Sequence, residues 1–104
     1  MAVLYIDTRD NTKTIVGLDK NRLEKPTGVD KSQQVLTLIN QILKKHLPRR
    51  KAGKKTLKDI SEIKVETGPG SFTGLRVGVA VANALAWGLG IKVNNKDRVE
   101  PKYD

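Results

Sequence analysis

Short apolar runs near the start of the chain predict strands. Ala2–Ile6 is continuously apolar, which is typical of a strand buried on both faces, and Thr14–Leu18 follows it after the polar turn Asp7–Lys13. The two runs predict a hairpin, because a polar turn lets the chain reverse between adjacent strands. Asn21–Lys25 predicts a third strand, exposed at the edge of the same sheet.

Helical spacing begins at Lys31 and continues to Leu47. Asp30 is placed to cap the first turn of this helix, and Pro48 is placed to end it. The apolar positions recur at intervals of three and four residues, which places them on one face: Val35, Leu38, Ile39, Ile42 and Leu43. This face predicts a helix that packs on the sheet.

The second half of the chain continues the alternation of helix and strand. Thr56–Glu62 predicts one or two helical turns, and Ile63–Glu66 predicts a fourth strand. A glycine-rich turn then leads into a long helix, whose sequence Val77–Gly90 is almost entirely apolar or small and needs cover on most sides. Ile91–Val93 predicts a fifth strand, and the polar tail Asn94–Asp104 is expected to be loose.

The resulting order of elements is βββαβαβ. A hairpin followed by helical crossovers predicts an α/β fold, with a five-stranded mixed sheet and two long helices packed on it. The 104 residues suffice for one small domain. We expect that domain to occupy residues 1–93 and the tail to occupy residues 94–104.

Composition excludes several kinds of site. The chain has no cysteine and a single histidine, His46, so we expect neither a disulfide nor a metal site, and no cofactor is indicated. Twenty basic and 11 acidic residues give a net charge of +9, which favours a polyanion or an acidic protein as partner. No signal peptide is visible, and the longest apolar run falls short of the ~20 residues of a membrane span. We expect a cytoplasmic protein that does not enter a membrane.

Gly68-Pro-Gly-Ser-Phe-Thr-Gly-Leu-Arg76 is the most distinctive segment. Its glycines follow the pattern Gly-x-Gly-x-x-x-Gly, one residue longer than the dinucleotide-binding pattern, and no Gly-Lys-Ser/Thr follows. Gly70, Ser71 and Thr73 are candidates to hold an anion at the start of the helix. The favoured interpretation is structural, with glycine required by the turn and Ser71 acting as the helix cap.

Small residues form two rows along the second long helix. The rows, each with a spacing of four, are Gly74, Gly78, Ala82 and Ala80, Ala84, Gly88. Such rows let another helix approach closely, at a cost of about 1 kcal/mol for each interior glycine relative to alanine. We expect one row to pack inside this chain and the other to contact a partner protein. The predicted contact surface comprises Leu75, Gly78, Val79 and Ala82, with Leu38 and Ile42 of the first helix.

Several motifs resemble those of the TsaB family, also called YeaZ, over residues 2–93. The most specific is Gly68–Ala80, in its strand–turn–helix context. Further matching segments are Ile6-Asp-Thr8, Gln34–Leu43, Leu57–Ile60 and Gly88–Ile91. The resemblance implies a single actin/Hsp70-like (ribonuclease H-like) lobe, with the family's usual second lobe absent here.

The resemblance also implies a function in making threonylcarbamoyladenosine next to the anticodon of tRNA. In that family TsaB is not the catalyst; it pairs with a related enzyme subunit, TsaD, through the long helices of the two first lobes. We therefore expect a non-catalytic subunit that forms a heterodimer with a TsaD-like protein. A homodimer through the same helices is an alternative.

Asp7 and Thr8 form the other candidate site that the resemblance suggests. ATPases of the superfamily bind phosphate and metal with a hairpin at this place, but they need a second lobe to close the cleft. We therefore interpret Asp7 and Thr8 mainly as turn residues. A nucleotide-binding protein that uses the Gly68–Gly74 turn remains an alternative function, and a small basic RNA-binding module is another.

A strongly basic segment follows the first helix. Eight basic residues lie between Lys44 and Lys58, with no acid before Asp59. Contact with the phosphate backbone of tRNA and a solvated loop are equally open interpretations. The segment has no aromatic residue to stack on a base, so base-specific recognition is not expected. The candidate phosphate contacts are Arg49, Arg50, Lys51, Lys54 and Lys55.

Overall fold

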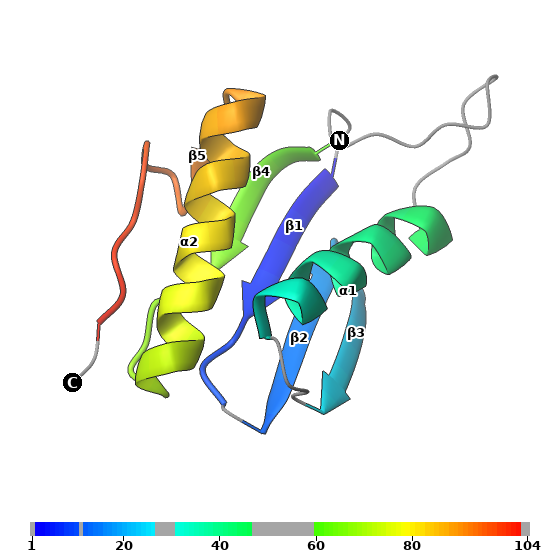
Figure 1. Ribbon diagram of the computed structural model, residues 1–104. Coiled ribbons are helices and arrows are strands. Elements are labelled where there is room, and N and C mark those ends of the chain that lie inside the picture. Colours follow the sequence, from blue (N-terminus) through cyan, green and yellow to red (C-terminus); the bar gives the residue numbers. More distant parts are fainter. Residues whose placement is uncertain (1, 11, 27–30, 47–59, 103–104) are drawn as a thin grey trace, which may run out of the picture.

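The computed structural model describes residues 2–10, 12–26, 31–46 and 60–102, which form one mixed sheet with two helices (Figure 1). The order of the elements is βββαβαβ, as predicted. Their bounds are β1 (Ala2–Asp7), β2 (Lys13–Leu18), β3 (Asn21–Pro26), α1 (Lys31–His46), β4 (Ile60–Val65), α2 (Phe72–Leu89) and β5 (Lys92–Val93).

The strands lie in the order β3-β2-β1-β4-β5. β1 pairs with β2, and β2 with β3, in antiparallel register, so that Leu4 lies opposite Leu18. β4 lies parallel to β1, with Ile63 opposite Leu4, and β5 lies parallel to β4. The predicted α/β class and the five-stranded mixed sheet are therefore confirmed.

Both helices cover the same face of the sheet (Figure 1). β1 places Leu4 and Ile6 in the core beneath them, while Val3 and Tyr5 on the opposite face are only half-buried. The prediction that this strand is buried on both faces is therefore wrong for the part of the chain that the structure describes, because the helices lie over one face there. The largest fully buried side chains include Val16, Leu18, Val35, Leu38, Ile42, Ile63, Leu75 and Val93.

β4 begins earlier than the local pattern predicts. Ile60–Glu62 belongs to the segment that predicts helical turns, but it is strand, with Ile60 opposite Ala2 and Glu62 opposite Val3. Pairing with β1 overrides local preference here, because the position of a strand in a sheet depends on neighbours that are distant in sequence. The predicted cap Asp30, the predicted helix end at Pro48 and the rest of the predicted turns lie outside the described residues.

α2 begins at Phe72, before the apolar stretch from which it was predicted, and Ser71 is its N-cap. The Ser71 side chain accepts a hydrogen bond from the N–H of Gly74, as the structural interpretation of this serine predicts. Of the described helices, α2 alone is long and apolar enough to cross a membrane. In this fold it instead packs Val79 and Ala82 against the sheet.

The segment after β5 packs along α2 rather than lying loose, so the prediction of a loose tail is wrong as far as residue 102 (Figure 1). Val99 is only 7% exposed. Its N–H donates to the Asn83 side-chain oxygen over 2.9 Å, and its carbonyl accepts from the Asn83 amide over 2.8 Å. We name residues 94–102 the strap. The buried Val99 side chain and the two hydrogen bonds of the Asn83 amide therefore hold this mostly polar segment against α2.

Candidate functional site

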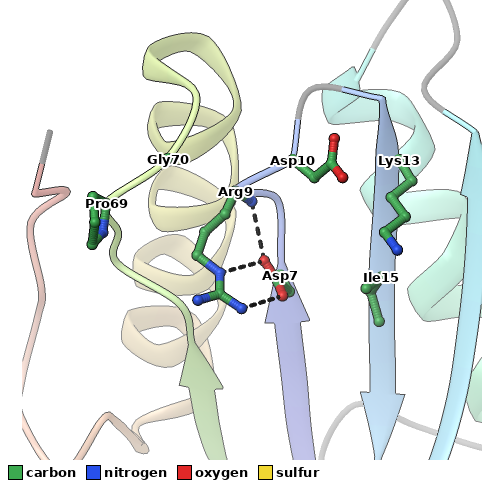
Figure 2. Close-up of a pocket in the computed structure, with 7 residues that line it drawn as sticks. All are labelled: Asp7, Arg9, Asp10, Lys13, Ile15, Pro69 and Gly70. Atoms are coloured by element: carbon green, nitrogen blue, oxygen red, sulfur yellow. Dashed lines mark hydrogen bonds and ion pairs between the residues drawn. The ribbon is translucent and has the colours of Figure 1, made fainter.

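The loop after β1 contacts the glycine turn that precedes α2. The Ser71 N–H donates to the Arg9 carbonyl over 2.8 Å, and the Thr8 hydroxyl donates to the Gly74 carbonyl over 2.5 Å. Figure 2 shows Arg9 and Asp7 at this junction, with Pro69 and Gly70 on the neighbouring turn. The hydrogen bonds join two segments that are more than 60 residues apart in sequence, as the 66-residue separation of Thr8 and Gly74 shows.

Two glycines of α2 are explained by the closeness of Thr8. A Cβ at Gly74 would overlap the carbonyl oxygen of Thr8, and a Cβ at Gly78 would overlap its hydroxyl oxygen. Thr8 itself is fully buried. Gly74 and Gly78 are four residues apart, so they lie on the same face of consecutive helical turns, and both turns contact the loop that carries Thr8. Their spacing is therefore explained by a contact inside this chain.

Asp7 is buried and is held by Arg9. The Arg9 guanidinium donates to both carboxylate oxygens, at 3.1 Å and 2.9 Å, and the Arg9 N–H donates as well, at 3.1 Å (Figure 2). Burial opposes ionisation, but the hydrogen bonds and the charge of Arg9 together lower the pKa of the Asp7 carboxyl below its ordinary value. The carboxylate is therefore ionised and already neutralised by a residue of its own chain.

Tyr5 joins Asp7 to Glu66 on the face of the sheet away from the helices. Its hydroxyl lies 2.8 Å from a Glu66 carboxylate oxygen and 3.3 Å from one of Asp7. Burial and the two carboxylates raise the pKa of the Tyr5 hydroxyl, which stays protonated and donates to both. Together with Arg9, these side chains form a polar network with paired charges.

Lys31 is a buried residue of this region that the sequence did not single out. Its ammonium donates to the backbone carbonyls of Asp10 and Lys13, over 3.1 Å and 3.3 Å, and so holds the β1–β2 turn against α1. Burial lowers its pKa. The sequence held one sign of this role. A lysine in the first turn of a helix is disfavoured by the helix dipole, so its ammonium is expected to have acceptors outside the helix.

An open hollow of about 410 Å³ lies beside this junction, and Asp7 and Gly70 both line it (Figure 2). The other three candidates for a nucleotide or anion contact do not line this hollow. Thr8 is buried against α2, Ser71 caps the helix, and Thr73 lines a different groove. The structure therefore brings together two of the five residues predicted for this site. Within the described ranges, no group of three or more histidine and acidic side chains could hold a metal ion.

The six residues predicted for partner contact are all buried within this chain. Leu38, Ile42, Leu75 and Ala82 are 0% exposed, Val79 is 3% exposed, and Gly78 faces Thr8. The choice of this face was wrong, because the row Gly74, Gly78, Ala82 packs internally. The expectation that one of the two rows packs inside the chain is confirmed. The residues predicted for partner contact, however, include Gly78 and Ala82 of that inner row.

The second row of small residues lies on the outside of α2. Ala80, Ala84 and Gly88 are exposed, and Trp87 beside them is 87% exposed. At the start of the helix Phe72 is 56% exposed, with the Arg76 guanidinium 5.4 Å from its ring centre. A groove of about 420 Å³ runs past this face, lined by Ser32 of α1 and by residues of α2 from Phe72 to Val81. The exposed side of α2 thus carries the small residues Ala80, Ala84 and Gly88, with Phe72 at the start of the helix and Trp87 beside Gly88 near its end.

The predicted phosphate contacts of the basic segment, Arg49, Arg50, Lys51, Lys54 and Lys55, lie outside the described residues. Their proposed contact with tRNA therefore stays a prediction.

Comparisons with known proteins agree on one group of relatives. A family model described as "TsaD: tRNA N6-adenosine threonylcarbamoyltransferase" matches residues 26–95. The chain is similar to the "tRNA threonylcarbamoyladenosine biosynthesis protein TsaB" of Bacillus subtilis (strain 168), with 48% identity over 42 residues, 40% of this chain and 18% of that protein. It is similar to the protein of the same name from Buchnera aphidicola subsp. Baizongia pistaciae (strain Bp), with 33% identity over 92 residues, 86% of this chain and 38% of that protein.

Solved structures show the same likeness. "YeaZ from Pseudomonas aeruginosa" superposes with a TM-score of 0.70 at 26% identity, covering 88% of this chain and 41% of that chain. A second structure, titled as an uncharacterized protein with similarity to peptidase YEAZ from Pseudomonas aeruginosa, shares the fold with a TM-score of 0.71 at 24% identity, covering 99% and 43%. The chain therefore spans less than half the length of the relatives it matches.

Proposed function

Since the chain belongs to the TsaB (YeaZ) family, we propose that it is a non-catalytic subunit that supports a TsaD-like enzyme in threonylcarbamoyladenosine modification of tRNA. The observation that carries this proposal is the division of α2 into two rows of small residues. One row packs on Thr8 inside the chain, and the other, Ala80, Ala84 and Gly88, is exposed.

The exposed row suits close contact with a helix of another protein. Small side chains let two helix backbones approach and gain dense van der Waals contact. Trp87, next to the last residue of the row, and Phe72, about two helical turns before its first residue, have the large exposed surface that dominates the binding energy of many interfaces. A TsaD-like subunit is the proposed partner, and the groove between α1 and α2 extends the contact surface.

The state of Asp7 supports a non-catalytic role. Its two oxygens accept three hydrogen bonds from Arg9 and one from the Tyr5 hydroxyl. A magnesium ion that carries a nucleotide would have to displace the guanidinium before it could reach this carboxylate. This arrangement favours a structural role for Asp7 over the nucleotide-binding alternative.

The proposal is tested by placing a charge in the exposed row. Ala84→Arg should weaken binding to the TsaD-like subunit at least about tenfold in calorimetry, because a long charged side chain prevents close helix contact. Asn21→Arg, which adds the same charge on the exposed strand β3, is the matched control and should bind like the unmodified chain. Equal affinities of the two variants would contradict the proposal, provided that both keep the unmodified melting temperature.

The same face offers the homodimer as an alternative. Sedimentation of the chain alone distinguishes the two, because a homodimer through this row shifts to monomer in the Ala84→Arg variant. A chain that sediments as monomer before substitution favours the heterodimer.

A further inference from the structure

The strap has a fixed backbone although most of its side chains are polar. The amide of Asn83 binds Val99 in the middle of the strap, and the Lys102 N–H donates to the Thr67 carbonyl over 2.6 Å near its end. Asn94, at its start, donates from its side chain to the Val65 carbonyl over 3.0 Å and accepts from the Val65 N–H over 2.9 Å. These hydrogen bonds fix the backbone of the strap, and with it the positions of the Cα atoms that carry its side chains.

Basic side chains gather around a groove of about 500 Å³ between the strap and the turn after β4. Lys96, Arg98 and Lys102 all line this groove. Arg98 also lines an adjoining hollow of about 440 Å³, together with Arg76 of α2. Four cations, three of the strap and one of α2, therefore line two adjoining hollows.

The acidic residues nearby do not neutralise these cations. Asp97 is exposed and is paired with Lys92, whose hydrogen bond lowers the pKa of the Asp97 carboxyl. Glu100 is the other carboxylate that the described residues place at the groove. Among the described residues, neither Lys96, Arg98 nor Lys102 forms an ion pair. The part of the groove that the structure describes is therefore lined by three cations and one carboxylate.

We propose that the strap groove binds the phosphate backbone of RNA. The inference rests on the proposed function in making tRNA the expected RNA. The groove residues are other residues than those of the exposed row of α2 and of the basic segment, although Arg98 lines a hollow together with Ala80 of that row. Lysine and arginine side chains on a held backbone bind phosphate oxygens without reading the base sequence. Among the described residues, the lining includes no aromatic side chain. The described lining therefore offers neither a base-stacking platform nor the aromatic anchors typical of protein interfaces.

The binding should therefore depend steeply on salt. Each phosphate that a cation neutralises contributes about 0.7 to 0.9 to the slope of log affinity against log salt concentration. Three such contacts at the groove contribute about 2 to that slope, and they should contribute nearly equally for RNAs of different sequence.

The test compares the full chain with two triple variants in tRNA binding from low to moderate salt. Lys96→Ala/Arg98→Ala/Lys102→Ala removes the groove cations. Lys20→Ala/Lys25→Ala/Lys64→Ala removes the same charge from other exposed positions and is the control. We expect the slope to fall by about 2 in the groove variant and to stay near its original value in the control.

Glu100→Gln provides a substitution with the opposite sign. Removing the Glu100 carboxylate from the groove should strengthen tRNA binding several-fold, whereas loss of a merely structural residue would not. Equal slopes in the two triple variants, no gain from Glu100→Gln, or no tRNA binding by the full chain would each overturn the inference. Melting temperatures of all variants check that they fold.

Failure of this inference is distinguishable from failure of the proposed function. A Lys96→Ala/Lys102→Ala variant, which keeps the Arg98 that lines a hollow with Ala80, should bind the TsaD-like subunit normally in calorimetry. If this double variant binds the subunit normally and the salt slope of the triple groove variant for tRNA binding is unchanged, the RNA-binding groove is rejected while the proposed function stands. Normal subunit binding by Ala84→Arg rejects the partner surface, whatever the groove does.

Discussion

The hydroxyl oxygen of Thr8 occupies the position that a side chain at Gly78 would need. Thr8 is fully buried, and its hydroxyl is held by the hydrogen bond to the Gly74 carbonyl. The β1–β2 loop and α2 are therefore in contact through a threonine and a glycine, with no room for even a methyl group between them. This contact positions the glycine turn and the start of the helix whose outer face we propose as the partner surface.

Gly78→Ala should destabilise the fold. The added methyl group must push Thr8 aside, and overpacking of this kind costs about 1–3 kcal/mol in the free energy of unfolding. Denaturant unfolding measures the change. Gly88→Ala is the control, since its Cβ would meet nothing within 4 Å. It should raise stability by about 0.5–1 kcal/mol through better helix propensity.

A double variant sharpens this prediction. Thr8→Ala removes the hydroxyl that the new methyl group would meet, so Gly78→Ala should cost less in that background than in the unmodified chain. Additive effects of the two substitutions would show that they do not share the contact.

Arg9→Ala should change how stability depends on pH. Arg9 lowers the folded-state pKa of the Asp7 carboxyl below its ordinary value, so in acid the folded state binds fewer protons than the unfolded chain. The stabilisation is fully present above the unfolded pKa and is lost as the pH falls through the lowered folded pKa. The variant should therefore be less stable at pH 7, and its deficit should shrink below about pH 4.

Melting temperatures from pH 7 to pH 2 measure this effect. Lys20→Ala, an exposed change away from Asp7, should give a difference from the unmodified chain that varies little over the same range. Other carboxylates with lowered pKa values, such as Asp10, contribute equally to both proteins and cancel in the comparison. A deficit of Arg9→Ala that stays constant in acid would show that the guanidinium does not stabilise the ionised carboxylate.

Asn83→Ala should release the strap from α2. The change removes both hydrogen bonds to Val99 and leaves its backbone groups without these partners, at a cost of about 1–3 kcal/mol. Amide hydrogen exchange at Val99 should become much faster. Asn40→Ala, on the exposed side of α1, is the control and should leave that exchange rate unchanged. Equal protection of Val99 in both variants would mean that other contacts hold the strap.

The most successful predictions concern elements whose signals are local. The spacing of Val35, Leu38 and Ile42 predicted α1, and all three side chains are buried in the structure. Ser71 was predicted to cap α2, and its side chain does accept from the Gly74 N–H. Such signals depend on the periodicity of a single element or on hydrogen bonds within one turn, so they can be read without knowing the neighbours.

The failures concern contacts between distant segments. Ile60–Glu62 is strand because β1 lies beside it, and the strap is held because Asn83 matches the backbone of Val99. Lys31 was missed because its partners are carbonyls of another loop. In each case the deciding partner is at least 16 residues away in the chain.

The sequence by itself determined the order of the elements, the capped start of α2 and the presence of two rows of small residues on that helix. Only the tertiary structure decided that Gly74, Gly78 and Ala82 face inward while Ala80, Ala84 and Gly88 face outward. Helical periodicity assigns residues to faces, but two faces of similar size and polarity are equivalent until a neighbour is placed. Thr8 is that neighbour, because its buried hydroxyl and carbonyl leave room for glycine alone on the turns of α2 that they meet.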